Sequence, residues 1–217
     1  MCNLYRLRHG PAAILDIARA MSRVGNLEPL PGIYPDYPAP IVRLNALGER
    51  ELVMARWGMP TPPQFLKTKT GAPKKSDPGV TNIRNVKSPH WRRWLGPESR
   101  CLVPFSAFSE PPVGARGPET WKWFALSQDQ PLAFFAGVWT SWTSTRKMKE
   151  GPVTTDLFGF LTTEPNGVVA PIHAKAMPVI LTEPEEWVTW LTAELAEAMK
   201  LQRPLPDDSL VVVDSPA

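Results

Sequence analysis

Proline is the feature that most limits the folds open to this chain, because 26 of its 217 residues are proline. Proline fixes one backbone angle and lacks a backbone N–H, so it interrupts helices and is confined to turns and exposed strand positions. Five prolines fall between residues 27 and 40, where we expect a rigid extended loop. The proline content excludes a helical bundle and predicts many short elements joined by loops.

Strand-like apolar runs are spread along the chain. They cover residues 4–7, 41–45, 51–57, 101–108, 120–126, 132–139, 157–163 and 210–213. The runs at 132–139 and 157–163 are too apolar for a sheet edge, which predicts an internal sheet or a barrel wall. Cys101 lies in one of these runs and is expected to be a buried small hydrophobe.

Beside these strands we expect two amphipathic helices and a basic helix-prone stretch over residues 89–95. The first follows Gly10-Pro11, and its inward face holds Ile14, Ile17, Ala18 and Met21. The second starts at a capping box over residues 182–185 and runs to about Lys200, with Val188, Leu191, Leu195 and Met199 inward. The expected fold class is therefore α+β: a single domain over residues 1–217, with a mainly antiparallel, barrel-like core and flanking helices.

Composition narrows the class of protein further. Hydrophobic residues make up 43% of the chain and charged residues 21%, which is typical of a soluble globular protein. We find no apolar run of signal-peptide or membrane-span length, so a cytoplasmic protein without membrane contact is expected. We also expect a monomer. The two cysteines form no CxxC pair and no nucleotide-binding or metalloprotease motif occurs, so neither a metal nor a cofactor is expected.

Positive charge is concentrated in one segment. Residues 65–100 hold nine lysines and arginines against two acidic residues, together with His90, Trp91 and Trp94. Cations interleaved with aromatic rings suit single-stranded nucleic acid, although a solvated loop would have the same composition. The part from about residue 65 to residue 80 is polar and rich in turn residues, which predicts a mobile basic loop.

Cys2 can perform chemistry that no internal cysteine can. Removal of Met1 would place a free α-amine and a thiol on the same residue. The amine can condense with an aldehyde, and the thiol can then close a five-membered thiazolidine ring. Alternatively, the thiolate can act as a simple nucleophile with the amine as its base.

Five ordered motifs resemble those of the SRAP family (SOS response-associated peptidase, the abasic-site processing proteins). They are Met1-Cys2, the turn 57–60 that starts at Trp57, the segment 82–84 that starts at Asn82, the strand 100–110 that ends at Glu110, and Ile172-His173 followed by the segment 177–181. Three details differ from the family pattern. Asn3-Leu4 replaces Gly-Arg, Val86 replaces a glutamate, and one additional residue separates His173 from Met177.

The resemblance implies a sensor of abasic sites in single-stranded DNA. The protein would couple to the lesion through Cys2 and shield it, and it would have an autopeptidase activity that removes Met1. Asn82 would position the ligand, Glu110 would be the acid/base group and His173 would transfer protons. Arg84 would contact phosphate, and Trp57 and Thr162 would also lie at the DNA.

Two other functions fit the same residues. An amidohydrolase or peptidase with an N-terminal cysteine could use the same four groups for acyl transfer, but it would also need an oxyanion hole. A noncatalytic single-strand-binding module would leave Glu110 and His173 without a role.

Overall fold

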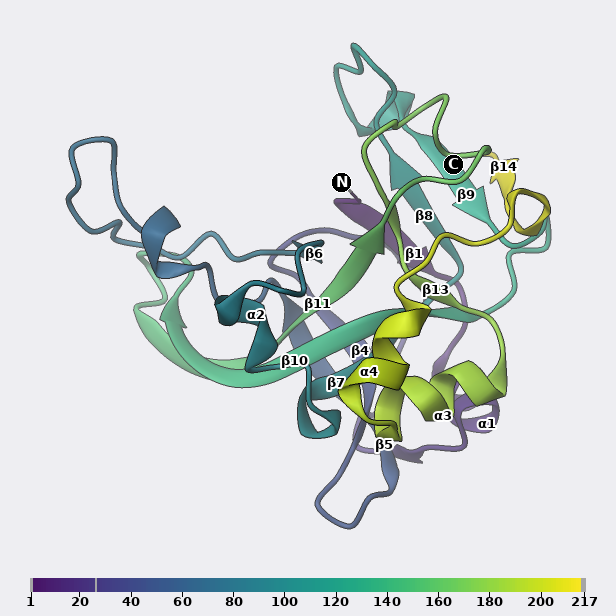
Figure 1. The fold of residues 1–217 in the computed structure, drawn as a ribbon, viewed down its shortest axis with the longest axis horizontal. Helices are drawn as coiled ribbons and strands as arrows, with labels where there is room; N and C mark the ends of the chain where they lie inside the picture. Colours follow the sequence, from purple (N-terminus) through teal and green to yellow (C-terminus); the bar gives the residue numbers. More distant parts are fainter. Residues whose placement is uncertain (1, 26, 216–217) are drawn as a thin grey trace.

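The computed structural model describes residues 2–25 and 27–215 of the chain. Five strands close into a barrel (Figure 1). They are β4 (Pro38–Leu44), β5 (Arg50–Trp57), β7 (Arg100–Phe105), β10 (Ala133–Thr145) and β11 (Pro152–Thr163). Neighbours in the order β5-β4-β7-β10-β11 pair antiparallel, and a parallel pairing of β11 with β5 closes the ring. The expected α+β fold with a barrel-like core is confirmed, and both β10 and β11 lie inside the sheet.

A second sheet packs beside the barrel in the strand order β14-β9-β8-β1-β3. Its strands are β1 (Leu4–Leu7), β3 (Leu30–Ile33), β8 (Ala107–Glu110), β9 (Lys122–Ala125) and β14 (Val211–Val213). Ser106 separates β7 from β8, so the chain passes from the barrel into the second sheet at this residue. The short strands that extend the barrel sheet are β2 (Met21–Ser22), β6 (Asn82–Ile83), β12 (Met177–Pro178) and β13 (Ile180–Leu181).

Tyr5 joins the two sheets. This buried ring on β1 contacts Trp57, Phe135 and Phe160 of the barrel edge-on, at centroid distances of 5.0, 5.7 and 6.1 Å. Edge-to-face contacts of this kind stabilise a core beyond the area they bury. Because Tyr5 is anchored in this way, the start of β1, and Cys2 with it, is held against the barrel.

The helices are short and lie outside the barrel: α1 (Pro11–Ala18), α2 (Pro89–Arg92), α3 (Pro184–Thr192) and α4 (Leu195–Ala198). Figure 1 shows α3 and α4 side by side along one flank of the barrel. Trp190 of α3 fixes this position, since its Nε1 donates to the main-chain oxygens of Cys101 and Gly137 at 3.0 Å each.

The first helix is shorter than the sequence predicts. It ends at Ala18, because Arg19 takes a left-handed conformation with φ 48°. The chain then turns into β2, so Met21 is 45% exposed and Ile17 is 38% exposed. Only Ile14 and Ala18 of the predicted inward face are buried.

The prediction of one C-terminal helix to about Lys200 is also wrong. The capping box forms one residue later than expected, between Glu183 and Glu186, and the helix stops where Ala193 becomes extended. This shift turns Trp187 and Trp190 inward and leaves Val188 46% exposed. Burial of two indole rings removes more apolar surface from water than burial of the aliphatic face predicted from the sequence would.

The expected loop between residues 27 and 40 contains strand structure instead. Here β3 forms an edge of the second sheet, where a proline removes no ladder hydrogen bond that the sheet needs. In β4 the prolines pair only toward β5, since β7 contacts β4 at Val42 and Arg43.

The segment 67–79 has no helix or named strand, as predicted, and projects from the barrel (Figure 1). Its mobility stays a prediction, as does the assignment of residues 1–217 to a single domain. Within residues 2–25 and 27–215, no helix combines the length and apolar character that crossing a bilayer requires.

Candidate functional site

Cys2 lies two residues before β1 and is fully buried. Antiparallel pairing of β1 with β8 sets Leu4 opposite Ser109, which brings the N-terminal end of β1 to the C-terminal end of β8. The Cys2 Sγ donates to the Leu4 main-chain oxygen at 3.5 Å. Burial, followed by the negative charge of Glu110, raises the pKa of this thiol well above its usual value. The thiol is therefore neutral near pH 7.

Asn82 holds Cys2 from the other side. It stands on β6, which pairs in parallel with β11 so that Asn82 lies opposite Phe160. Its Nδ2 donates to the Cys2 main-chain oxygen at 2.7 Å and to Thr81 Oγ1 at 2.8 Å. Its Oδ1 is buried and has no hydrogen-bond partner within the described part of the chain. The amide thus fixes the backbone of Cys2 and retains an acceptor for a ligand.

Glu110 is the last residue of β8 and is completely buried. Burial raises the pKa of its carboxyl from 4.5 to about 7, because the charged form loses its hydration. Near neutral pH the group therefore exists in both protonation states, which is the condition that favours a general acid or base.

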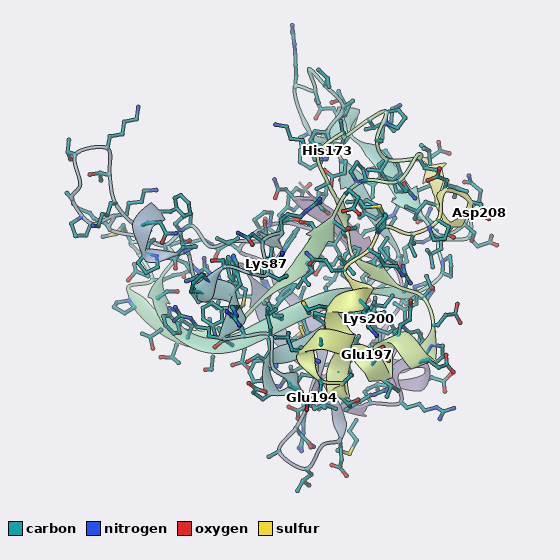
Figure 2. The ribbon with its side chains drawn as sticks, in the orientation of Figure 1. Lys87, His173, Glu194, Glu197, Lys200 and Asp208 are labelled. Atoms are coloured by element: carbon teal, nitrogen blue, oxygen red, sulfur yellow. The ribbon has the colours of Figure 1, made fainter. Side chains whose placement is uncertain are left out.

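His173 stands on the segment between β11 and β12, in the upper part of the molecule in Figure 2. Its Nδ1 lies 3.0 Å from the Ala176 main-chain oxygen and 3.7 Å from Glu110 Oε2. A carbonyl oxygen only accepts, so in the neutral ring Nδ1 bears the proton and Nε2 is the basic nitrogen. Burial lowers the pKa of this imidazole, which favours the neutral form.

The structure thus brings together the four residues predicted to be catalytic. Cys2, Asn82, Glu110 and His173 come from four segments that are far apart in the sequence. Contact distances link Asn82 to Cys2 and Glu110 to His173, and the charge of Glu110 acts on Cys2. The cluster can bind a polar ligand through the amide and move protons through the carboxyl and the imidazole.

The three residues predicted to bind DNA are placed differently. Arg84 is exposed, and its guanidinium lies 3.3 Å from Glu164. Thr162 is 1% exposed, and within the described ranges its buried Oγ1 has no hydrogen-bond partner. Trp57 is also 1% exposed. Its ring stacks on Phe160 and its Nε1 donates to the Thr81 main-chain oxygen.

The Trp57 ring is therefore covered in this structure and lies against Thr81. Its contact with DNA, like those of Arg84 and Thr162, stays a prediction. The aromatic side chains of the basic segment are covered as well. His90, Trp91 and Trp94 are 9%, 7% and 5% exposed and pack on one another. The exposed cations of that segment remain available to phosphate, whereas Arg100 is buried.

Two supporting residues escaped sequence reasoning. Thr81 connects the site, since its Oγ1 accepts from Asn82 and donates to Asn3 Oδ1 at 3.3 Å. Arg146, from the bend after β10, donates to the main-chain oxygens of Gly58 and Asp77 and so fixes the segment that leads into Asn82. Gly79, with φ 75°, leaves room for this guanidinium. The sequence signal for this contact is the two glycines near Trp57 and Asn82, which leave room for the guanidinium. The arginine itself lies far away in the sequence, so the sequence does not show what fills this room.

No group of three or more His, Cys, Asp or Glu side chains is arranged to hold a metal ion within residues 2–25 and 27–215. Met1, whose removal the sequence predicts, lies outside the described residues.

The fold and the site define a class of protein: a closed five-stranded barrel with a flanking sheet, and a cysteine near the N-terminus set beside an amide, a carboxyl and an imidazole. The model of the SRAP family, described as SOS response associated peptidase, matches residues 1–214, and the chain belongs to that family. A comparison with curated proteins found no match.

Solved structures share this fold. A protein from Bordetella bronchiseptica is 23% identical with a TM-score of 0.69, over 97% of this chain and 98% of that one. A protein from Bacteroides thetaiotaomicron is 19% identical with a TM-score of 0.68, over 97% and 90% of the two chains. A phage-related protein from Bordetella bronchiseptica is 17% identical with a TM-score of 0.66, over 97% and 92%. At these identities the similarity establishes the fold alone.

Proposed function

We propose that this protein senses abasic sites in single-stranded DNA and forms a covalent thiazolidine with them through Cys2, after Met1 has been removed. The observation that supports this most directly is the junction of Cys2, Asn82, Glu110 and His173 at one place. Membership of a family described by the SOS response agrees with a role in DNA damage.

The chemistry begins with hydrolysis of the Met1–Cys2 peptide bond, which consumes one water and frees the α-amine. The amine nitrogen attacks the aldehyde carbon of the ring-opened sugar, and the aldehyde oxygen takes a proton to give a carbinolamine. Loss of its hydroxyl as water leaves an imine. The Cys2 sulfur then bonds to the imine carbon while the thiol proton moves to the nitrogen. The coupling releases one water and needs no oxidant or reductant.

The surrounding groups match these proton transfers. Protonated Glu110 gives a proton to the leaving hydroxyl, and its carboxylate form takes the thiol proton, which a pKa of about 7 permits. His173 Nε2 accepts and returns protons at the opened sugar. Asn82 holds the Cys2 backbone in place and offers Oδ1 to a sugar hydroxyl.

DNA binding would rest on exposed cations. Arg84 follows Asn82 by two residues and stands outside the buried cluster. The lysines of segment 67–75 add charge on the projecting loop. Each phosphate contact releases counterions, so affinity should fall with salt at a slope of roughly −0.7 per contact. Binding that does not depend on salt would contradict electrostatic recognition.

The second candidate is a peptidase or amidohydrolase that uses Cys2 on a small amide. The family description as a peptidase favours it. In this function the Cys2 sulfur would attack an amide carbonyl, and water would release the acyl group. Removal of Met1 by the protein itself would be one such reaction.

The test is an abasic oligonucleotide run on a denaturing gel with two forms of the protein. One form has Cys2 at its N-terminus, and the other retains a residue before Cys2. Only the first should give a stable adduct, because an amide nitrogen cannot form an imine. An oligonucleotide whose abasic aldehyde has been reduced with borohydride is the matched control and should give none.

A normal yield of adduct with the blocked form would contradict the thiazolidine mechanism. Turnover of amide substrates without any adduct would favour the peptidase instead. Mass spectrometry of the purified protein should show Cys2 as its first residue, and intact Met1 in an active preparation would also contradict the mechanism. The monomeric state and the cytoplasmic location stay predictions.

A further inference from the structure

Arg6 is a buried cation on the outer face of the second sheet. Leu4 and Arg6 alternate with Tyr5 and Leu7 along β1, so Arg6 points away from the main core, toward Trp123. Arg6 is 5% exposed, and its guanidinium carbon lies 4.7 Å from the centre of the Trp123 ring. An arginine side chain remains charged in proteins, so this position holds a permanent positive charge with little exposure to water.

The partners of Arg6 do not balance that charge. One guanidinium nitrogen donates to Gln130 Oε1 at 2.6 Å and to the Asp214 main-chain oxygen at 3.3 Å. Both oxygens are neutral. Within residues 2–25 and 27–215, Arg6 forms no ion pair and its buried Nε has no hydrogen-bond partner. A buried charge without an opposite charge is costly, and the positive charge of nearby Arg8 adds to that cost.

A cavity of about 490 Å³ opens beside this guanidinium. Its cationic side is formed by Arg6 and Arg8, and its apolar side by Leu7, Pro29 and Pro31. Gln130, Asp214 and Ser215 form the polar end. The hydrogen bond from Arg6 holds the Gln130 amide there. The volume falls within the range of small-molecule sites.

We propose that this cavity binds an organic carboxylate with an apolar body. The planar carboxylate matches the fork of a guanidinium and would supply the missing negative charge. The apolar body would lie against Leu7, Pro29 and Pro31. Inorganic phosphate fits less well, because oxygens turned toward these three residues would have no donor. The site lies outside the Cys2 cluster and does not depend on the function proposed above.

Asp214 allows a test of whether binding depends on the charge of the cavity. Its side chain is exposed and lines the same cavity, so its negative charge opposes a bound anion. Replacement of Asp214 by asparagine should therefore strengthen carboxylate binding, whereas a cavity that bound its ligand by apolar contact alone would not respond.

The experiment is isothermal titration calorimetry on the full chain, with hexanoate as the probe and hexanamide as its neutral counterpart at equal ionic strength. Hexanoate should bind saturably, whereas hexanamide and inorganic phosphate should not. Arg6→Met should weaken hexanoate binding about tenfold or more. Arg8→Gln should weaken it and Asp214→Asn should strengthen it, each by about threefold. Arg116→Gln, an exposed arginine outside the cavity, is the matched control and should not change it.

No binding of hexanoate, equal binding of hexanamide, preferential binding of phosphate, or full affinity in Arg6→Met would each overturn the proposal. If Arg6→Met does not fold by circular dichroism, Arg8→Gln and Asp214→Asn decide the question, and unchanged affinity in both would overturn it. Formation of the abasic-site adduct by Arg8→Gln should match the unmodified protein, which separates this site from the Cys2 cluster.

Discussion

Cys2 and Cys101 are both fully buried, and burial raises the pKa of both thiols, yet their surroundings differ in chemistry. Cys101 stands in the barrel wall on β7, opposite Gly137 of β10. A side chain at Gly137 would collide with its sulfur, which shows how closely the wall packs. Cys2 instead lies where the two sheets meet, with Asn82 of β6 on its main-chain oxygen and the charge of Glu110 of β8 acting on its thiol.

The comparison shows that burial by itself makes a cysteine a small apolar residue. It also bears on the order of the chemical steps. A thiol with a raised pKa is a poor attacking group, because the thiolate is the nucleophile. The α-amine would therefore react first, and the thiol would close the ring on an imine already formed beside Glu110.

The largest difference is expected from replacing each cysteine by alanine. Cys2→Ala without Met1 keeps the α-amine, so it should form an imine that borohydride traps but no durable adduct. Cys101→Ala should form the normal adduct. A denaturing gel with and without borohydride measures both. A durable adduct from Cys2→Ala would show that the thiol has no part in the product.

Glu110→Gln tests whether the carboxyl makes Cys2 different. We expect crosslinking to slow by about 100-fold, because the glutamine cannot exchange protons. The rate of the unmodified protein should change with pH around a midpoint near 7, set by the raised pKa of Glu110, and the variant should lack this step. Affinity for intact single-stranded DNA is the control and should stay unchanged. An unaltered pH profile in the variant would remove Glu110 from the mechanism.

The same variant should change the pH dependence of stability. The pKa of Glu110 is about 7 in the folded protein and near 4.5 in the unfolded chain, so the folded state binds the proton more tightly. The stability that the protonated carboxyl gives the folded state is fully present below pH 4.5 and is lost as the pH rises through 7. At pH 8, Glu110→Gln should therefore be more stable, by up to roughly 3 kcal/mol. The free energy of unfolding in urea, measured for both proteins at pH 5 and pH 8, tests this. An equal difference in stability between the variant and the unmodified protein at the two pH values would contradict it.

Arg84→Ala should have a smaller effect on the adduct. It removes an exposed cation close to Asn82 and leaves the buried cluster intact, so DNA affinity should fall several-fold and the salt slope by about 0.7. Crosslinking at saturating DNA should continue. Glu164→Gln is the matched control, because it frees Arg84 from its 3.3 Å ion pair and should strengthen binding at low salt. Normal affinity without crosslinking in Arg84→Ala would assign this residue to the chemistry.

The smallest effect on the adduct is expected from Cys101→Ser. A hydroxyl at this buried position should cost about 1–3 kcal/mol of stability, since the barrel wall around it is apolar. The yield of adduct at a temperature where the variant is folded should equal that of the unmodified protein. Thermal unfolding and the denaturing gel together measure this contrast, and a lower yield from a folded variant would give Cys101 a role at the site.

The sequence by itself determined the class of the fold and most of its strands. Alternation and apolar runs reveal strands locally, and β1, β5 and β14 lie within one residue of the predicted bounds. In contrast, β11 starts five residues before its predicted run, and the run 101–108 is divided between β7 and β8. The ordered motifs also pointed to the residues of the cluster, because Cys2, Asn82, Glu110 and His173 are each of a type that suits the chemistry.

Only the tertiary structure decided which side chains meet and which face water. Trp57, Trp91 and Trp94 look like stacking platforms in the sequence, but the barrel buries them because indole rings gain more from the core than from solvent. Three contacts join residues far apart in the chain: the pairing of β11 with β5, the hydrogen bond of Arg146 to Gly58, and the hydrogen bond of Arg6 to Gln130. Local sequence has no signal for such contacts, since they arise only when the sheets pack.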